Sequence, residues 1–366
     1  MIISNEPAMD RLQAVFREKN MRKTIICLLA LALVAVSQTS FAKTQIKIAT
    51  LAPQNSGWAK QLRAGSKEIG ERTENRVNLK FYWGGAQGNE AKVLQKIKIG
   101  QLHGGTFAPT DFQNRYPDSN IYGLPFFFET LEEVDYVRSR IDPMLQAGFS
   151  ELGFRTFGFA GGGFAYILSK QPVRSFADLK GKKVWLPQGD LISYEAMKAL
   201  QLSPVPLPLT DVLTGLQTGL IDIVTIPPVV ALALQWHTRV QYMTQIPVLY
   251  AMGFMAINER ALKKLQAEDR QIVTEVLTRI YTNVNAASRA EGQNAIEALV
   301  GVGVENVKPD PGAFEQIRSS MSATIREMAG QGLFSRQLLD RMQGYVDEYR
   351  SQHKHSAQPA SSGGTR

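Results

Sequence analysis

Glycine-rich runs are the first residues in this sequence that could do chemistry, because glycine loops can hold the phosphates of nucleotides. The run Gly84–Gly88 lacks the Gly-Lys-Ser/Thr that would place a lysine and a magnesium-binding hydroxyl beside a phosphate. The run Gly161–Gly163 does not open a predicted helix, so no helix N-terminus would offer its amides to an anion. Nucleotide binding is therefore not expected, and these glycines predict turns or a hinge.

Metal ligands and reactive thiols are also scarce. His103 and His237 have no carboxylate or second histidine at ligand spacing beside them. His353 and His355 lie in a polar C-terminal segment, where only weak adventitious metal binding is expected. The single cysteine, Cys27, lies inside an N-terminal apolar run. The rest of the chain therefore predicts no metal site, no cofactor, no disulfide and no cysteine nucleophile.

Local signatures of catalysis are missing from the sequence. A nucleophile elbow, a metalloprotease helix and a Ser-x-x-Lys arrangement are all absent. A Ser-His-Asp triad assembled from distant segments stays open, because such triads are defined in space and not along the chain. The sequence favours a protein that is not an enzyme, with an exported hydrolase or a periplasmic scaffold or sensor as the other classes.

Aromatic residues and prolines are unusually frequent in loops that follow predicted strand ends. Ligands of open α/β sheets bind beyond the carboxyl ends of strands and between domains. These residues are therefore candidate ligand contacts, although any one of them could instead pack in a core or between lobes. The candidate ligand-binding residues are Leu51, Trp58, Gln87, Phe107, Phe127, Phe164, Tyr166, Trp185, Pro187, Thr225, Pro227, Pro228 and Tyr250.

Alternating strand and helix patterns must position these candidates. Ile46–Ala49 and Val77–Trp83 alternate as strands do, and Leu102–Phe107 is a third extended segment. Helical patterns lie between them, and Asn55 or Ser56 can cap the first. Strands that alternate with helices predict a parallel, wound sheet.

A second α/β unit follows a long extended segment. Phe154–Ser169 predicts a glycine-containing strand that crosses from one lobe to another. Lys183–Leu186, Val205–Pro208 and Leu220–Ile226 are the strands of the second unit, and Phe254–Asn258 is expected to cross back. Three helical patterns then close the chain. Two α/β lobes joined by extended crossovers are therefore expected.

The N-terminus predicts export. Met21–Lys23 is a short basic start, and the apolar run Ile25–Val36 leads to a small-x-small pattern with expected cleavage after Ala42. The apolar run is too short to span a bilayer, and a buried N-terminal helix is the alternative. Either Met1 or Met21 can be the start. A soluble periplasmic protein is expected, with a polar, disordered tail over 351–366.

The charge pattern argues against nucleic acid as a partner. Lys and Arg number 41 against 33 Asp and Glu, and the basic residues are dispersed among acidic ones. A nucleic-acid-binding protein would concentrate them in a stripe or an arm. We therefore interpret the excess as a soluble basic surface.

Several short motifs, taken in order, resemble one known family. They are Gly84–Glu90 (GGAQGNE), Gly123–Phe128 (GLPFFF), Pro172–Lys183 (PVRSFADLKGKK), Leu213–Asp222 (LTGLQTGLID) and Gly253–Asn258 (GFMAIN). Each motif is degenerate, but the order and spacing resemble the solute-binding proteins of tripartite ATP-independent periplasmic (TRAP) transporters, the DctP-like family. The resemblance spans essentially the whole mature chain.

The resemblance implies a fold and partners. It implies an α/β protein with the two-lobed periplasmic solute-binding fold, extended crossover strands and a long helix that braces both lobes. It also implies capture of a small organic ligand for TRAP membrane subunits. The expected divisions are 1–42 as upstream extension and signal peptide, 43–160 as lobe I (completed by about 254–300), 161–253 as lobe II (completed by about 301–350), and 351–366 as the tail.

One position departs from the family pattern. Many members bind organic acids through an arginine two residues after the position of Lys183, and here Trp185 stands there. Arginine binds a carboxylate through two parallel hydrogen bonds, whereas tryptophan offers an apolar wall and one N–H donor. We hypothesise a ligand more apolar or larger than a simple dicarboxylate. The alternative is an ordinary organic acid held by another cation, such as Arg155 or Arg174. A comparably arginine-deficient subgroup is associated with a TPR-repeat periplasmic partner.

Overall fold

The computed structural model describes residues 43–354. The upstream extension, the export segment with its cleavage after Ala42 and most of the predicted tail lie outside the described residues. The helix α11 (Arg336–Lys354) continues past residue 350, so the first residues of the predicted tail are helical instead. Within the described part of the chain, no helix is both long and apolar enough to cross a membrane.

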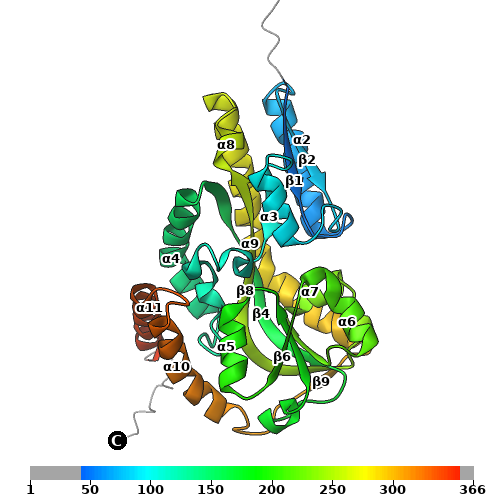
Figure 1. Cartoon of the computed structure of the whole chain (residues 1–366), viewed down its shortest axis with the longest axis vertical. Helices are drawn as coiled ribbons and strands as arrows, with labels where there is room; N and C mark the ends of the chain where they lie inside the picture. Colours follow the sequence, from blue (N-terminus) through cyan, green and yellow to red (C-terminus); the bar gives the residue numbers. More distant parts are fainter. Residues whose placement is uncertain (1–42, 355–366) are drawn as a thin grey trace, which may run out of the picture. The chain divides into compact units, whose positions relative to one another are not determined.

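One mixed sheet organises the described chain (Figure 1). Its strands follow the order β2-β1-β3-β8-β4-β7-β5-β6, and β9 pairs with β8. The strands toward each end of this order pair in parallel, as strands joined through helices do. The strands are β1 (Thr44–Ala49), β2 (Val77–Tyr82), β3 (Gly104–Phe107), β4 (Phe154–Ser169), β5 (Lys183–Pro187), β6 (Ser203–Leu207), β7 (Ile223–Ile226), β8 (Tyr242–Asn258) and β9 (Glu305–Val307).

Helices follow the strands in the predicted alternation, which confirms the α/β class. The hydroxyl of Ser56 accepts a hydrogen bond from the Ala59 amide and caps α2, as expected. The sequence patterns do not predict α7, which begins at Pro228, where the fixed φ of proline suits a first helical residue. Besides α11, the helices are α2 (Gly57–Arg72), α3 (Glu90–Lys98), α4 (Leu131–Glu151), α5 (Leu191–Ala199), α6 (Val212–Thr218), α7 (Pro228–Ala233), α8 (Glu259–Leu262), α9 (Ala267–Gly301) and α10 (Glu315–Gly330).

Two long antiparallel strands, β4 and β8, connect the two halves of the sheet. The sequence predicts β4 over its full length. For β8 the predicted start at Phe254 is wrong, because the strand begins at Tyr242. The first part of β8 was not predicted because it contains Pro247, and proline is normally absent from the interior of a strand. It is tolerated because it lies within residues 245–248, which are not paired with β4.

The glycines of β4 form an irregular point in this crossover. The register with β8 shifts between Gly161 and Gly163. Gly163 has a φ of +85°, a conformation that favours glycine. The predicted bend in this strand is therefore present, and the hinge role stays a prediction.

Buried apolar residues form three clusters. The first is large and includes Phe112, which is fully buried. The second contains Trp185 and Trp236, whose rings meet edge to face with centroids 5.2 Å apart. The third, with Ile167 and Phe314 among its members, lies in the second half of the sheet. This third cluster borders the cavity described below.

The helix α9 is 35 residues long and contacts α2, β4 and α7 (Figure 1). It therefore reaches elements of both halves, which confirms the expected bracing helix. Its buried residues fall in two groups, Asp269–Val284 and Ala295–Leu299, and none of residues 285–294 is buried. The helix is thus packed toward its ends and largely solvent-facing between them.

Candidate functional site

A cavity of about 750 Å³ lies at the carboxyl ends of three strands. The segments Pro109–Asp111 after β3, Pro187–Asp190 at the end of β5, and Thr225–Pro227 at the end of β7 contribute to its wall. Small-molecule pockets typically measure about 300–1,000 Å³. Both the place and the size match the expected ligand site of an α/β sheet.

One part of the cavity wall is apolar. Ile167, Val184 and Ile223 come from the neighbouring strands β4, β5 and β7, Met197 comes from α5, and Ile317 comes from α10. All five belong to the third buried cluster or pack against it. The side chains of this cluster therefore surround an open space, whereas the side chains of an ordinary core fill the space between them. An apolar wall of this kind suits a ligand with an apolar body.

Another part of the wall is polar and acidic. Asp190, 5% exposed, accepts hydrogen bonds from the Ser193 amide at 3.0 Å and from Asn120 Nδ2 at 3.3 Å. Asp111 accepts one from the Ala108 amide at 2.8 Å. Glu90, at the start of α3, is the third carboxylic acid in the wall. Among the described residues that line the cavity, exposed Arg115 is the one basic side chain.

The carboxyl groups of this acidic wall resist ionisation. Burial raises the pKa of Glu90 and of Asp190. Burial, and then repulsion from Glu90, raise the pKa of Asp111 well above its usual range. Each shift has the sign expected where negative charge lacks a compensating cation. No group of three or more His, Cys, Asp and Glu side chains within residues 43–354 is arranged to hold a metal ion.

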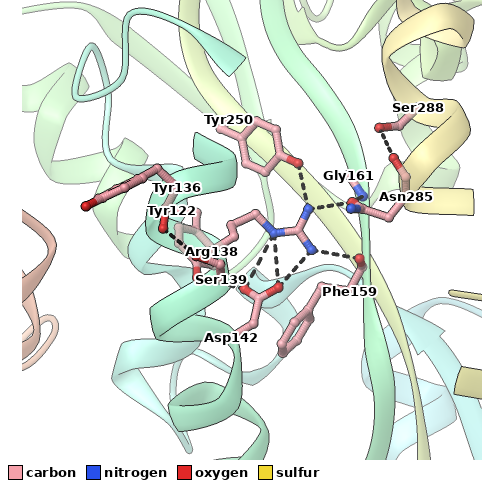
Figure 2. A network of polar contacts seen from close by, with 10 residues as sticks. All are labelled: Tyr122, Tyr136, Arg138, Ser139, Asp142, Phe159, Gly161, Tyr250, Asn285 and Ser288. Atoms are coloured by element: carbon pink, nitrogen blue, oxygen red, sulfur yellow. Dashed lines mark hydrogen bonds and ion pairs between the residues drawn. The ribbon is translucent and has the colours of Figure 1, made fainter. Parts of the chain in front are cut away.

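A buried arginine lies next to the cavity but is saturated by protein partners (Figure 2). Arg138 donates to Asp142 from Nε and Nη2, to Tyr250 and Asn285 from Nη1, and to the carbonyl of Phe159 from Nη2. A guanidinium has five N–H donors, so all of them are used. Arg138 is therefore not available to a ligand.

The hydrogen bonds of Arg138 also hold together the elements beside the cavity wall, where the crossover strands β4 and β8 pass. Burial alone would lower the pKa of Arg138, but Tyr250 and Asp142 beside it raise that pKa above its usual range. The Asn285 side chain of α9 accepts from the Gly161 amide of β4 as well. The network thus ties α4, α9, β4 and β8 together at one point, and Tyr250, which lines the cavity, is one of its members.

The predicted ligand contacts divide into two groups. One group lines the cavity, and the other lies elsewhere in the described chain. The predicted residues that line the cavity are Trp185, Pro187, Thr225, Pro227 and Tyr250. Their strands, β5, β7 and β8, all come from the central and second-half part of the sheet order.

Four predicted contacts from the first half pack against protein neighbours instead. Trp58 meets the ring of Tyr281 edge on at 5.0 Å, and Phe107 is buried against Phe112 at 5.2 Å. Gln87 accepts two hydrogen bonds from Lys96 Nζ. Leu51 lies beside the turn that contains Gly85.

The other four predicted contacts also lie outside the cavity wall. Phe127 packs edge on against Phe128, and Phe164 packs edge on against Tyr250. Tyr166 is half-buried and packs against both of the first two clusters. Pro228 is buried at the start of α7.

The position of Trp185 corrects one expectation from the sequence. The indole is 1% exposed and packs on Trp236, and its Nε1–H donates to the carbonyl of Leu207 at 3.1 Å. The residue borders the cavity, but its ring is a core side chain of the second cluster and its N–H is already used. Trp185 is therefore neither an open wall nor a donor to ligand. The suggested substitutes Arg155, paired with Glu259, and Arg174 do not line the cavity either.

Several residues that line the cavity are not predicted by the patterns of the sequence. Thr110 and Asp111 lie in the loop after β3, and Asp190 lies in the loop after β5, so the same strand-end rule that selected aromatics could have found them. Met197 and Ile317 lie on helical faces that look like ordinary core positions. Nothing in a helical pattern distinguishes a face that borders a cavity from one that borders a packed core.

Comparisons with known proteins were consistent across sequence and structure. The model of the bacterial extracellular solute-binding protein family 7 (DctP) matches residues 48–331. A solute-binding protein of Roseobacter denitrificans is 24% identical over 85% of this chain and 96% of its own length. The 2,3-diketo-L-gulonate-binding periplasmic protein of Escherichia coli is 21% identical over 78% of this chain and 87% of its own.

Solved structures show the same fold. The sugar acid-binding protein of Advenella mimigardefordensis in complex with galactonate has a TM-score of 0.78, with 15% identity over 84% of this chain and 99% of its own. A TRAP periplasmic solute-binding protein of Desulfovibrio salexigens with bound orotic acid has a TM-score of 0.74, with 18% identity over 84% and 99%. These likenesses confirm the two-lobed α/β fold. The chain therefore belongs to family 7 of the bacterial extracellular solute-binding proteins, as the resemblance predicted.

Proposed function

We propose that this protein captures a small organic ligand with a largely apolar body and delivers it to a TRAP-type secondary transporter. The observation that carries this proposal is the hollow third cluster, in which residues such as Ile167, Val184 and Ile223 face a cavity of about 750 Å³. Removing apolar surface from water is favourable by about 25 cal/mol for each Å². An apolar ligand body that covers these side chains is stabilised in this way.

We expect the ligand of this protein to differ in chemistry from the galactonate and the orotic acid that the solved relatives hold. The sequence resemblance implies arginine at position 185, and this chain has tryptophan there, buried against Trp236. The donors of Arg138 are all used within the protein. A buried carboxylate without a paired cation costs several kcal/mol, so an apolar body suits this cavity better.

Capture would couple to closure of the two lobes. The cavity takes residues from both sides of the crossovers, for example Asn120 before α4 and Met197 in α5. A ligand that touches both sides favours the closed arrangement by its difference in affinity for the two states. Delivery to membrane subunits follows from the family, and a TPR-repeat partner is proposed from the sequence resemblance alone.

The test is to identify the compound that the protein carries when it is purified from its natural host without refolding. Mass spectrometry of the denatured protein should show a released organic compound that is richer in carbon than a sugar acid. The variant Met197→Trp, which fills part of the cavity from α5, is the matched control and should carry less of it. Tight binding of galactonate or succinate by calorimetry to a protein that releases nothing would contradict the apolar ligand.

An ordinary organic acid remains the second candidate, because Arg115 lines the cavity. An acid held by this residue should lose most of its affinity in the variant Arg115→Gln. The apolar ligand should not depend on this guanidinium, because Arg115 is exposed and lies on the polar part of the wall. Calorimetry with galactonate on both proteins separates the two candidates.

A further inference from the structure

We infer that the ligand is a long amphiphile, whose polar head lies at the carboxyl ends of β5 and β7 and whose unbranched apolar tail, about eight to ten carbons long, runs back toward their amino ends. The inference rests on the proposed function and adds the shape of the ligand and the place of each of its ends. Three features of the cavity carry it: its length, the separation of its polar and apolar residues, and the open face of the sheet.

The cavity extends along the strands as well as across their carboxyl ends. Val184 and Ile223 are paired neighbours near the amino ends of β5 and β7, and both line the cavity. Gln188 and Pro227, just past the carboxyl ends of the same strands, line it too. An extended chain rises about 3.3 Å per residue, so the path from Ile223 to Pro227 spans about 13 Å. The cavity is therefore elongated along these two strands.

The helix α5 gives a similar length on the other side of the cavity. It begins beyond the carboxyl end of β5 and runs back, because Ser203, shortly after the helix, pairs with Lys183 at the amino end of β5. Ser193 in its first turn and Leu200 at its C-terminus both line the cavity. A helix rises about 1.5 Å per residue, so these two residues lie about 10 Å apart along the axis.

This length sets the size of the tail. A zigzag carbon chain advances about 1.25 Å per bond, given C–C bonds of about 1.5 Å and bond angles near 111°. A span of about 10–13 Å therefore takes about eight to ten carbons.

Polar and apolar residues lie at opposite ends of the cavity. Near the amino ends of the strands the lining residues come from the turn before β5, from β5 and β7, from the second half of α5 and from α10, and within the described chain all of them are apolar. They include Phe176, Val184, Met197, Leu200, Ile223 and Ile317.

Polar side chains line the cavity from other segments. Asn114 lies in the loop after β3, Gln188 lies in the loop after β5, and Ser193 lies in the first turn of α5. A polar group at the apolar end would lose its hydration without gaining a partner. A compact ligand could contact only one end of the cavity, whereas a head and a tail about 10 Å apart suit both.

The sheet beside the apolar end has one filled face and one open face. Trp185 and Val224 pack in the second cluster. Val184 and Ile223, the residues before them, point to the opposite face and line the cavity, because successive residues of a strand alternate between faces. Met197, in the helix across the cavity, is half-buried, so it keeps apolar surface that no other side chain covers. An apolar tail would remove this surface from water.

The experiment measures how affinity depends on chain length. The probes 1-hexanol, 1-octanol, 1-decanol and 1-dodecanol are titrated by calorimetry into the mature protein after removal of any compound bound during purification. Affinity should rise about fourfold for each added CH₂ up to about eight to ten carbons and then change little, because a longer tail finds no further room.

The outcomes separate the inference from the proposed function. Affinity that does not rise beyond hexanol, or that rises unchanged to dodecanol, would overturn the inference. In either case, binding of the compact alcohol 1-adamantanol would leave the proposed apolar ligand intact. Tight binding of galactonate with no binding of any of these alcohols would overturn the proposed function, and the inference with it.

Substitutions at the apolar end test where the tail lies. Ile317→Trp narrows this end from α10 and should weaken binding of decanol about tenfold or more, while binding of hexanol changes little. Gln316→Trp is the matched control, because Gln316 is the preceding residue of α10 but is exposed and does not line the cavity. It should leave the affinity for both alcohols unchanged.

A second variant protects the test against misfolding. Ile223→Phe narrows the same end from the sheet and should have the same effect on decanol, and thermal unfolding shows which variants are folded. Equal losses for hexanol and decanol, or unchanged affinity for decanol in a folded variant, would contradict the inference.

Discussion

Phe112 and Phe314 are both buried phenylalanines, yet the space around them differs. Phe112 is 0% exposed, and its ring meets Phe107, Phe149 and Phe154 edge on, each at a centroid distance of 5.2 Å. Phe314 is 5% exposed and belongs to the third cluster, where it lines the cavity. The first half of the protein fills its core with side chains. The second half leaves part of a core open.

This difference teaches that apolar composition predicts burial but not what a buried residue touches. Both regions are built from the same residue types on the same sheet. In the first, interlocking aromatic rings satisfy one another. In the second, residues from β4, β5, β7, α5 and α10 stand around a common space. Interiors are normally close-packed, so the open space is a feature with a use.

The largest expected effect is a difference in stability between alanine variants of the two phenylalanines. Phe112→Ala should lower the free energy of unfolding by about 3–5 kcal/mol, because it leaves a new cavity in a filled core. Phe314→Ala should cost clearly less, about 1–2 kcal/mol, because one side of the ring already faces open space. Denaturant unfolding of both variants, freed of ligand, measures the comparison. Equal losses would show that the third cluster is filled in solution.

A smaller effect is expected at the buried arginine. Arg138→Met should lower the free energy of unfolding by about 3 kcal/mol, because it leaves the Asp142 carboxylate without its cation. This loss of stability lies at the low end of the range for a buried ion pair, because the Asp142 side chain is 22% exposed. Denaturant unfolding of Arg138→Met provides the measurement.

The double variant Arg138→Met with Asp142→Leu is its control, and it should recover part of the loss once no buried charge is left unpaired. A double variant that is less stable than the single one would show that the network stabilises the fold mainly through Tyr250 and Asn285.

The smallest effect on stability is expected from filling the cavity. Met197→Trp adds a large side chain to a half-buried position of α5 that faces the open space. The free energy of unfolding of the ligand-free protein should change by less than about 1 kcal/mol, since the added ring finds room. Thermal unfolding with and without a probe such as phenylbutanol checks it: the variant should gain less from the probe than the parent protein does. A strong destabilisation would mean that no such room exists.

Much of the fold could be predicted from the sequence. Period-two and helical patterns placed β1, β2, β4 and β5 and the helices between them, and capping by Ser56 marked the start of α2. The start of β8 was missed because Pro247 interrupts a strand that only the tertiary structure holds together. Local patterns describe local structure, and long crossover strands depend on partners far along the chain.

The candidate site was only partly predictable. The strand-end rule placed Trp185, Pro187, Thr225 and Pro227 at the cavity, because it follows from topology. It could not tell that the Trp185 ring turns toward Trp236, since side-chain direction within a strand depends on which face is covered. The choice of aromatic residues also passed over Thr110, Asp111 and Asp190, although these residues too lie in loops that follow strand ends.

The middle of α9 has a consequence of its own. Residues 285–294 carry no fully buried side chain, so polar contacts, such as those of Asn285 with Arg138 and of Arg289 with Asp135, connect this stretch to the rest of the protein. Its sequence, Asn-Ala-Ala-Ser-Arg-Ala-Glu-Gly-Gln-Asn, combines alanines, which favour a helix, with Gly292, which does not. The helix nevertheless runs through this span, while its two ends are held by different parts of the protein. A proline introduced at the exposed Ala290 would interrupt the connection between the two ends without entering either apolar cluster.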